Sequence, residues 1–155
     1  MKVCAGIITG RVRIWHYLEG TWNKDVAEKL YREAIAPALR KYCGRKRAYT
    51  ILEDNDPTGY KSKSAISAKA ELGIKPIQFP TYSPDLNPCD FALWSEVEGR
   101  MAKMKPKAET LDEWKARLRR TAMAIPEPTI RKMLGSIKKR AESIYQSNGG
   151  HIPRD

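Results

Sequence analysis

Two short runs of hydrophobic residues near the start of the chain have the character of β-strands. Residues 3–8 and 12–17 are rich in β-branched and aromatic side chains, and Gly10 lies between them, where a tight turn needs a residue that tolerates positive φ. This pattern predicts a β-hairpin. A third strand is expected at residues 48–52, which lead into a polar stretch, and a shorter one at residues 77–79.

The segments between these strands have hydrophobic residues at helical spacing. Asn23 is a suitable N-cap for the first predicted helix. The hydrophobic positions of that helix are Val26, Leu30, Ala34 and Leu39. Because a proline lacks the backbone N–H, Pro37 should bend or break this helix. Residues 61–72 predict a second helix that ends at Gly73.

The chain is helical in character after Asn87, which can cap a helix that has Pro88 in its first position. The buried face of that helix is predicted to consist of Phe91, Leu93, Trp94 and Val97. Residues 110–113 fit a capping box, and a last helix should begin near Pro128. The hydrophobic stripe of the last helix is formed by Ile130, Met133, Leu134, Ile137, Ala141 and Ile144.

The predicted order is therefore hairpin, helix, strand, helix, short strand and then helices. This order indicates an α/β fold, with a mixed sheet flanked by helices and a mostly helical C-terminal part. No internal repeat or low-complexity linker interrupts it. We expect one domain over residues 1–146, followed by a loose tail over residues 147–155.

The charge of the chain indicates a class of binding partner. The 155-residue chain has 29 lysines and arginines against 18 acidic residues, a net charge of +11. A field of this sign attracts polyanions, and nucleic acid is the usual one. Residues 99–140 hold 13 basic and 4 acidic residues, which is +9 of that net charge. The candidate nucleic-acid contacts are Arg100, Lys103, Lys105, Lys107, Arg131, Lys132, Lys138, Lys139 and Arg140. The alternative interpretation is a set of solvated helix faces.

Other site classes are disfavoured. Cys4, Cys43 and Cys89 are far apart in sequence, which argues against a disulfide framework and a structural zinc site. No hydrophobic run approaches the roughly 20 residues of a membrane span, and no secretory signal is evident. An intracellular protein without a membrane partner is expected.

Two aspartates stand where a carboxylate can serve a metal ion. Asp54 follows the strand at residues 48–52, and Asp90 lies in the first turn of the next major helix. Two ionised carboxylates close together repel unless a cation lies between them, and Mg²⁺ or Mn²⁺ prefers such oxygen ligands. The alternative roles are a turn former for Asp54 and a helix cap for Asp90.

The surroundings of both aspartates resemble a known family. Residues 79–94, with the run from Tyr82 to Pro88 before Asp90 and Trp94 after it, closely resemble the third-carboxylate motif of mariner-like transposases. Residues 52–57 resemble the second-carboxylate motif, an aspartate and asparagine pair that closes a strand. Residues 15–39, 125–130, 133–140 and 149–150 also resemble the family, so that nearly the whole chain is covered.

The resemblance implies a ribonuclease-H-like DDE/D endonuclease domain of the retroviral-integrase superfamily. It implies DNA transposition and integration by metal-dependent phosphoryl transfer, with Asp54 and Asp90 as catalytic residues and as ligands of a two-ion Mg²⁺ or Mn²⁺ site. Asp85 and Asn87 are expected to be structural, Trp94 to belong to the core rather than to stack on DNA, and Asp56 to be either a turn residue or a metal ligand.

The chain also departs from the family pattern. Relatives often have a histidine a few residues after the second aspartate, and residues 58–61 contain none. The family's first catalytic aspartate ends a strand that precedes the hairpin, and no acidic residue here is a natural substitute. An N-terminally truncated domain that is inactive alone and has unpaired sheet edges is therefore expected.

Three roles follow from this departure. The chain is either a transposase-derived, nucleic-acid-binding part of the catalytic domain, a non-catalytic DNA-binding module, or a module that pairs with full-length transposase or with its own copy. In a eukaryote the expected location is the nucleus.

Overall fold

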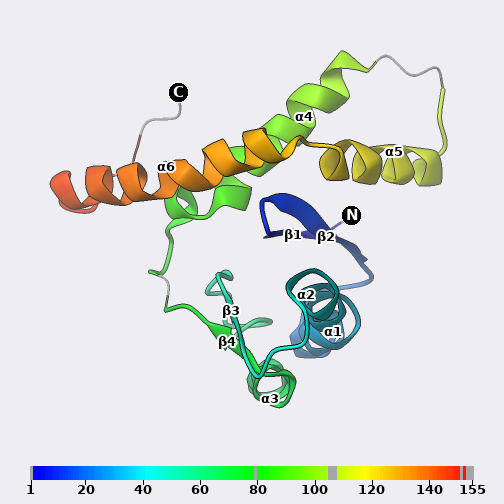
Figure 1. Cartoon of the computed structure of the whole chain (residues 1–155). Helices are drawn as coiled ribbons and strands as arrows, with labels where there is room; N and C mark the ends of the chain where they lie inside the picture. Colours follow the sequence, from blue (N-terminus) through cyan, green and yellow to red (C-terminus); the bar gives the residue numbers. More distant parts are fainter. Residues whose placement is uncertain (1, 79, 105–107, 151, 153–155) are drawn as a thin grey trace. The chain divides into compact units, whose positions relative to one another are not determined.

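The computed structural model describes residues 2–78, 80–104, 108–150 and 152, and its backbone is shown in Figure 1. The chain forms two compact units. The first contains the described residues of 1–9 and 13–83, and the second those of 10–12 and 84–155. The predicted division into a domain at residues 1–146 and a tail stays a prediction.

The predicted hairpin is confirmed. Strands β1 (Lys2–Ile8) and β2 (Arg11–Leu18) form a two-stranded sheet. Thr9 and Gly10 join them with φ angles of 50° and 74°. Two consecutive residues at positive φ are what a tight turn between right-twisted strands requires.

The first predicted helix is present and does not break at the proline. Asn23 caps α1 (Lys24–Leu30), because its side-chain oxygen accepts hydrogen bonds from the N–H groups of Asp25 and Val26. The helix then passes through a π-helical turn, η1 (Tyr31–Ile35), into α2 (Ala36–Cys43), with Pro37 in the first turn of α2. The π turn changes the hydrogen-bond register just before the proline, so the ladder continues past the missing N–H.

A second sheet is parallel and small. Strand β3 (Tyr49–Ile51) pairs with β4 (Ile74–Pro76) in the register Tyr49 to Ile74 and Ile51 to Pro76. Helix α3 (Lys63–Leu72) connects them, capped by Ser62 and ended by Gly73 in the left-handed conformation. The strand at 48–52 and the helix at 61–72 are thus confirmed.

The short strand predicted at residues 77–79 is wrong by three positions. β4 lies at residues 74–76, because Ile74 is buried in the core while Ile77 is 47% exposed. Ile77 contributes only the last bond of the pairing, from its N–H to the Ile51 carbonyl at 2.7 Å. Phe79 lies outside the described residues.

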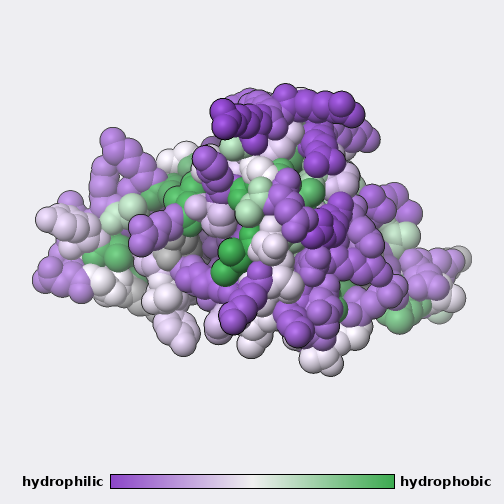
Figure 2. Space-filling model, turned by 90° about the horizontal axis from the view of Figure 1, so that it is seen from below, coloured by the Kyte–Doolittle hydropathy of each residue, from purple (hydrophilic) through white to green (hydrophobic). Residues whose placement is uncertain are grey.

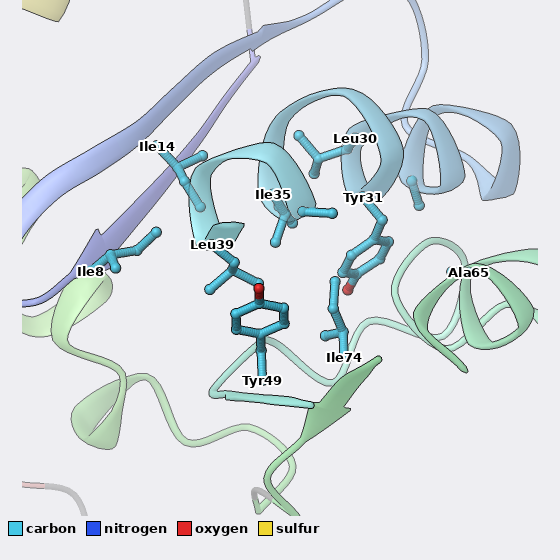
Figure 3. Packing of buried hydrophobic residues seen from close by; sticks show 11 residues of the cluster. Ile8, Ile14, Leu30, Tyr31, Ile35, Leu39, Tyr49, Ala65 and Ile74 are labelled. Carbon is cyan, nitrogen blue, oxygen red and sulfur yellow. The ribbon is translucent and has the colours of Figure 1, made fainter. Parts of the chain in front are cut away.

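One hydrophobic core holds the first unit together. As Figure 3 shows, side chains of the hairpin and of the α1–η1–α2 segment meet side chains of β3, β4 and α3. The labelled members of this cluster are Ile8, Ile14, Leu30, Tyr31, Ile35, Leu39, Tyr49, Ala65 and Ile74. Both two-stranded sheets therefore pack on a common core, which fixes the end of β3 where Asp54 follows.

The second unit is helical, as predicted. The turns η2 (Pro84–Leu86) and η3 (Cys89–Leu93) lead into α4 (Trp94–Lys103), followed by α5 (Leu111–Met123) and α6 (Glu127–Gln146). The capping box formed by Thr110 and Glu113 is confirmed. The buried side chains are Leu93, Val97, Ala122, Ile125 and Ile130. Phe91 and Trp94 are only half-buried.

Surface character agrees with the composition. Figure 2 shows hydrophilic side chains over most of the visible face, with separate hydrophobic patches between them. Among the described residues, no helix combines the length and the hydrophobicity that crossing a membrane requires.

Candidate active site

Asp54 follows β3 directly, as the sequence predicts for a carboxylate at a strand end, and it is exposed. Its negative charge affects the pKa values of two half-buried side chains of the first unit, Cys4 and Tyr60. Burial, followed by a smaller contribution from the charge of Asp54, raises the pKa of the Cys4 thiol to about 11, although a hydrogen bond with Tyr60 opposes the rise. Burial also raises the pKa of Tyr60, with Cys4 and then Asp54 adding to the effect. The charge of Asp54 thus favours the neutral forms of the Cys4 thiol and the Tyr60 phenol.

Glu53, the residue before Asp54, is held in a buried ion pair. Its carboxylate accepts hydrogen bonds from the Tyr31 hydroxyl and from Nζ of Lys69. Lys69 is 4% exposed and also donates to the Tyr60 carbonyl at 2.8 Å. Burial and the hydrogen bond with Glu53 raise the pKa of Tyr31. The chain on the N-terminal side of Asp54 is therefore fixed to α1–η1 and to α3.

Sequence reasoning did not find the ion pair between Glu53 and Lys69. One signal was available: Lys69 lies four residues after Ala65, and Ala65 and Ala68 form the buried face of α3. A lysine on the small-residue face of a helix is rarely buried without an acidic partner.

Asp56 stabilises the turn on the other side of Asp54. Its carboxylate accepts hydrogen bonds from Trp22 Nε1 at 2.6 Å, from the Gly59 N–H at 2.7 Å and from Thr58 Oγ1 at 2.9 Å. Burial alone would raise the pKa of Asp56, but these hydrogen bonds outweigh it and hold the pKa below its usual value. Of the two roles open for Asp56, this geometry supports the turn residue.

Gly59 completes the same turn. A Cβ at this position would overlap the indole ring of Trp22. The Trp22 ring also packs against Tyr60 with a centroid distance of 4.8 Å. Residues 58–61, where relatives often have a histidine, therefore form a tight turn against Trp22 and supply no imidazole.

Asp90 lies at the start of η3, as predicted, and is half-buried. Asn87 organises this turn: its side chain accepts from the Cys89 N–H at 3.1 Å, and its carbonyl accepts from the Asp90 N–H at 2.9 Å. Asn87 is 8% exposed. The structural role expected for Asn87 is thereby confirmed, and the N-terminal end of a helix favours the charged form of a carboxylate.

Arg140 of α6 packs on the segment that carries Asp90. Its guanidinium lies 4.1 Å from the centroid of the Phe91 ring and donates to the Asp85 carbonyl at 3.5 Å. Arg140 was a candidate DNA contact in the sequence. The structure adds a contact to the residue after Asp90, which sequence spacing could not indicate.

The other candidate DNA contacts differ in their partners. Arg100 pairs with Glu96 at 2.6 Å, Arg131 with Glu127 at 2.7 Å, and Lys138 lies 3.9 Å from Glu142. Exposed side chains are presented by Lys103, Lys132 and Lys139. Lys105 and Lys107 lie outside the described residues.

Asp54 belongs to the first unit and Asp90 to the second. Within the part of the chain that the structure describes, no three histidine, cysteine, aspartate or glutamate side chains are grouped so that they could hold a metal ion. The two candidate ligands are both carboxylates, and oxygen ligands of this kind fit Mg²⁺ or Mn²⁺. The donor chemistry of the chain therefore fits the implied ions.

The fold is similar to that of a solved transposase catalytic domain. The chain superposes on the catalytic domain of Mos1 mariner transposase with a TM-score of 0.83 and 19% identity, over 97% of this chain and 75% of that one. The Mos1 catalytic domain with raltegravir and Mn gives the same TM-score. The Mos1 paired-end complex with Mn gives 0.82 over 44% of that chain. The α/β, ribonuclease-H-like fold class is thus confirmed.

Sequence comparison finds similarity to transposases of transposable elements. The chain is 28% identical over 122 residues to the Tc1 transposase of Caenorhabditis elegans, covering 79% of this chain and 42% of that protein. It is 25% identical over 130 residues to the Tcb1 transposase of Caenorhabditis briggsae, covering 84% and 45%. No family model matches the chain. The resemblance to mariner-like transposases is confirmed, and the chain spans about half the length of these relatives.

Proposed function

We propose that this chain is the part of a mariner-type transposase catalytic domain that provides Asp54 and Asp90 for DNA transposition. The observation that carries the proposal is the combination of a Tc1-type sequence with the mariner catalytic fold over nearly the whole chain. The proposed reaction is DNA strand cleavage and transfer by metal-dependent phosphoryl transfer. With two of the family's three carboxylates, the chain alone is expected to be inactive.

Asp54 and Asp90 are the proposed ligands of Mg²⁺ or Mn²⁺. The exposure of Asp54 after β3 and the position of Asp90 in a helical first turn support this assignment. The related Mos1 catalytic domain has been solved with Mn and with Mg. Bound as a pair, such ions activate the attacking oxygen and stabilise the leaving oxygen in phosphoryl transfer.

The remaining residues of the site act by limiting the freedom of these two carboxylates. Asp54 lies between two fixed neighbours, Glu53 on Lys69 and Asp56 on Trp22. Asp90 is fixed through Asn87. A carboxylate whose supporting groups are already ordered binds an ion with less loss of conformational freedom.

DNA is the proposed partner, and the cations named from the sequence between Arg100 and Lys139 are its proposed contacts, whereas Arg140 is engaged with Phe91 and the Asp85 carbonyl. Mos1 has been solved as a paired-end complex with the left transposon end. A second copy or a longer transposase is a proposed protein partner, and the nucleus of a eukaryotic cell the proposed location.

A non-catalytic DNA-binding or transposase-interacting module is the second candidate. It is favoured by the exposed cations Lys103, Lys132 and Lys139, which do not depend on the carboxylates. Such a module would bind DNA in a salt-dependent way with little sequence preference.

Plasmid nicking with Mg²⁺ or Mn²⁺ tests the proposal, on this chain and on a version extended upstream. The extended version is expected to nick; in that version Asp54→Asn and Asp90→Asn should each abolish nicking, and the control Asp112→Asn, at a 94% exposed side chain of α5, should not. Nicking that survives both substitutions would refute the catalytic assignment. Absence of nicking in both versions with retained, salt-sensitive DNA binding would favour the second candidate.

A further inference from the structure

A second group of cations occupies the end of α2 and the loop that leads to β3, in the first unit. Residues 40–47, the α2–β3 basic segment, contain five cations and no acidic residue. They are Arg40, Lys41, Arg45, Lys46 and Arg47. This segment alone carries +5, and it belongs to the first unit with Asp54.

The five side chains are available to a ligand. All of them are exposed. Within the described ranges, no ion pair joins any of them to a carboxylate, whereas Arg100, Arg117 and Arg131 of the second unit each pair with a glutamate. A cation already paired with a carboxylate must give up that contact to bind phosphate, and an unpaired one need not.

The backbone of the segment is held in one shape by the core. The buried Tyr49 accepts a hydrogen bond from the Lys46 N–H at 3.2 Å, and its hydroxyl donates to the Gly44 carbonyl at 2.7 Å. Gly44 itself has a φ of 73°. At Gly73 a Cβ would stand 2.6 Å from the Arg47 carbonyl, so the close approach of the segment to the end of α3 requires glycine there.

A sixth cation joins the segment through an aromatic ring. The guanidinium of Arg13 on β2 lies 4.4 Å from the centroid of Tyr42, and Nζ of Lys41 lies 5.3 Å from the same centroid. Cation–π contact of this kind holds charged groups at the edge of the segment. The hairpin and α2 thus contribute to one positively charged surface.

We propose that the α2–β3 basic segment binds the phosphate backbone of duplex DNA. The inference rests on the proposed function for its substrate class and adds the surface, which lies on the unit that contains Asp54. Six like charges around one ordered loop match a polyanion with regularly spaced phosphates. A protein partner would call for large exposed hydrophobic side chains at the centre of the contact, and Tyr42 and Cys43 are half-buried.

The salt dependence of duplex binding tests this surface. A variant with Arg40, Lys41, Arg45, Lys46 and Arg47 all changed to Gln is compared with a control that has Lys2, Lys24, Lys61, Lys63 and Lys75 changed to Gln, five cations of the same unit that are not candidate DNA contacts. Both variants lose five exposed cations. The plot of log K against log salt has a negative slope, and each lost phosphate contact reduces the magnitude of that slope by about 0.9. Loss of three contacts therefore reduces it by about 2.7.

The magnitude of the slope should decrease by at least this amount in the segment variant, and by more than it does in the control variant. An unchanged slope in the segment variant, with DNA binding by the unaltered chain intact, overturns the inference and leaves the proposed function standing. Failure of the unaltered chain to bind duplex DNA at low salt overturns both. Tighter binding of a polyglutamate peptide or of RNA than of duplex DNA overturns the assignment of the partner.

A measurement on the unaltered chain removes any dependence on variant folding. Lysine acetylation followed by mass spectrometry compares the chain with and without duplex DNA. Protection of Lys41 and Lys46 beyond that of the exposed Lys61 and Lys75 supports the inference, and equal reactivity of Lys41 and Lys46 in both states overturns it.

Discussion

The indole Nε1 of Trp22 donates a 2.6 Å hydrogen bond to Oδ2 of Asp56, although 34 residues separate them in the sequence. Trp22 stands before the N-cap of α1, and Asp56 stands two residues after Asp54. The contact ties the loop that carries the candidate ligand to the beginning of the first helix. It also gives Asp56 a structural role in that loop.

Loss of the Asp56 charge should destabilise the first unit. Asp56→Asn removes a charged acceptor from Trp22, Thr58 and Gly59, and hydrogen bonds to charged groups contribute about 1.5–3 kcal/mol. Urea unfolding should show a decrease of this size. In a double-mutant cycle with Trp22→Phe, the two changes should be non-additive, because each removes the same bond. Additive losses would show that the bond contributes nothing.

The same carboxylate should make stability depend on acid. The folded pKa of Asp56 lies below its ordinary value of 3.8, so the unfolded chain binds this proton more tightly. The stabilisation is fully present above pH 3.8 and is lost as the pH falls through the folded pKa. The difference in unfolding free energy between the unaltered chain and Asp56→Asn should therefore be constant near neutral pH and shrink below pH 3.8. A difference that grows in acid would contradict the assignment.

Two glycines should respond to alanine in opposite directions. Gly59→Ala should destabilise the chain, because the new Cβ overlaps the Trp22 ring. Gly135→Ala is the matched control: Gly135 lies within α6 with no atom near its Cβ position, and alanine in a helix interior is favoured by about 0.5–1 kcal/mol. Thermal unfolding of both variants checks the pair. A neutral Gly59→Ala would mean that Trp22 does not occupy this place.

Local patterns predicted much of the fold, because they depend on neighbouring residues. Asn23, Gly73 and the capping box at Thr110 mark helix ends through contacts within a few positions. The position of β4 was missed because pairing of Ile74 with Tyr49 across the chain decided it. The continuous helix through Pro37 was missed because it depends on a π turn that has no clear sequence signal.

For the site, the resemblance to the family's two carboxylate motifs predicted Asp54 and Asp90 as ligands, and this assignment stays a prediction. The supporting contacts could not be predicted. Lys69 contacts Glu53, which is 16 residues away in the sequence, and Arg140 contacts Asp85, which is 55 residues away. Such contacts depend on tertiary packing, which sequence periodicity does not specify.

Substitutions of the buried pair Glu53 and Lys69 should have non-additive effects on the free energy of unfolding. Side-chain exposures are 11% for Glu53 and 5% for Lys69. Removing one partner of a buried ion pair leaves an uncompensated charge and costs about 3–5 kcal/mol. Lys69→Met and Glu53→Gln should each lower the unfolding free energy by this order. The double variant should lose less than the sum, and a fully additive loss would contradict the pairing.

Arg140 should affect stability more than DNA binding. Its guanidinium lies against Phe91, and a cation–π contact at such a site contributes about 0.5–1 kcal/mol. Arg140→Ala should therefore lower the unfolding free energy, whereas the control Lys139→Ala, at an exposed neighbouring position, should not.

DNA binding should show the opposite pattern. Removing a lysine that contacts phosphate reduces the magnitude of the salt-dependence slope of DNA binding by about 0.9. Lys139→Ala should show that decrease and Arg140→Ala should show little of it, because the guanidinium is engaged with Phe91 and the Asp85 carbonyl. The reverse result, a lowered slope with unchanged stability for Arg140→Ala, would make Arg140 a DNA contact rather than a support for the turn that carries Asp90.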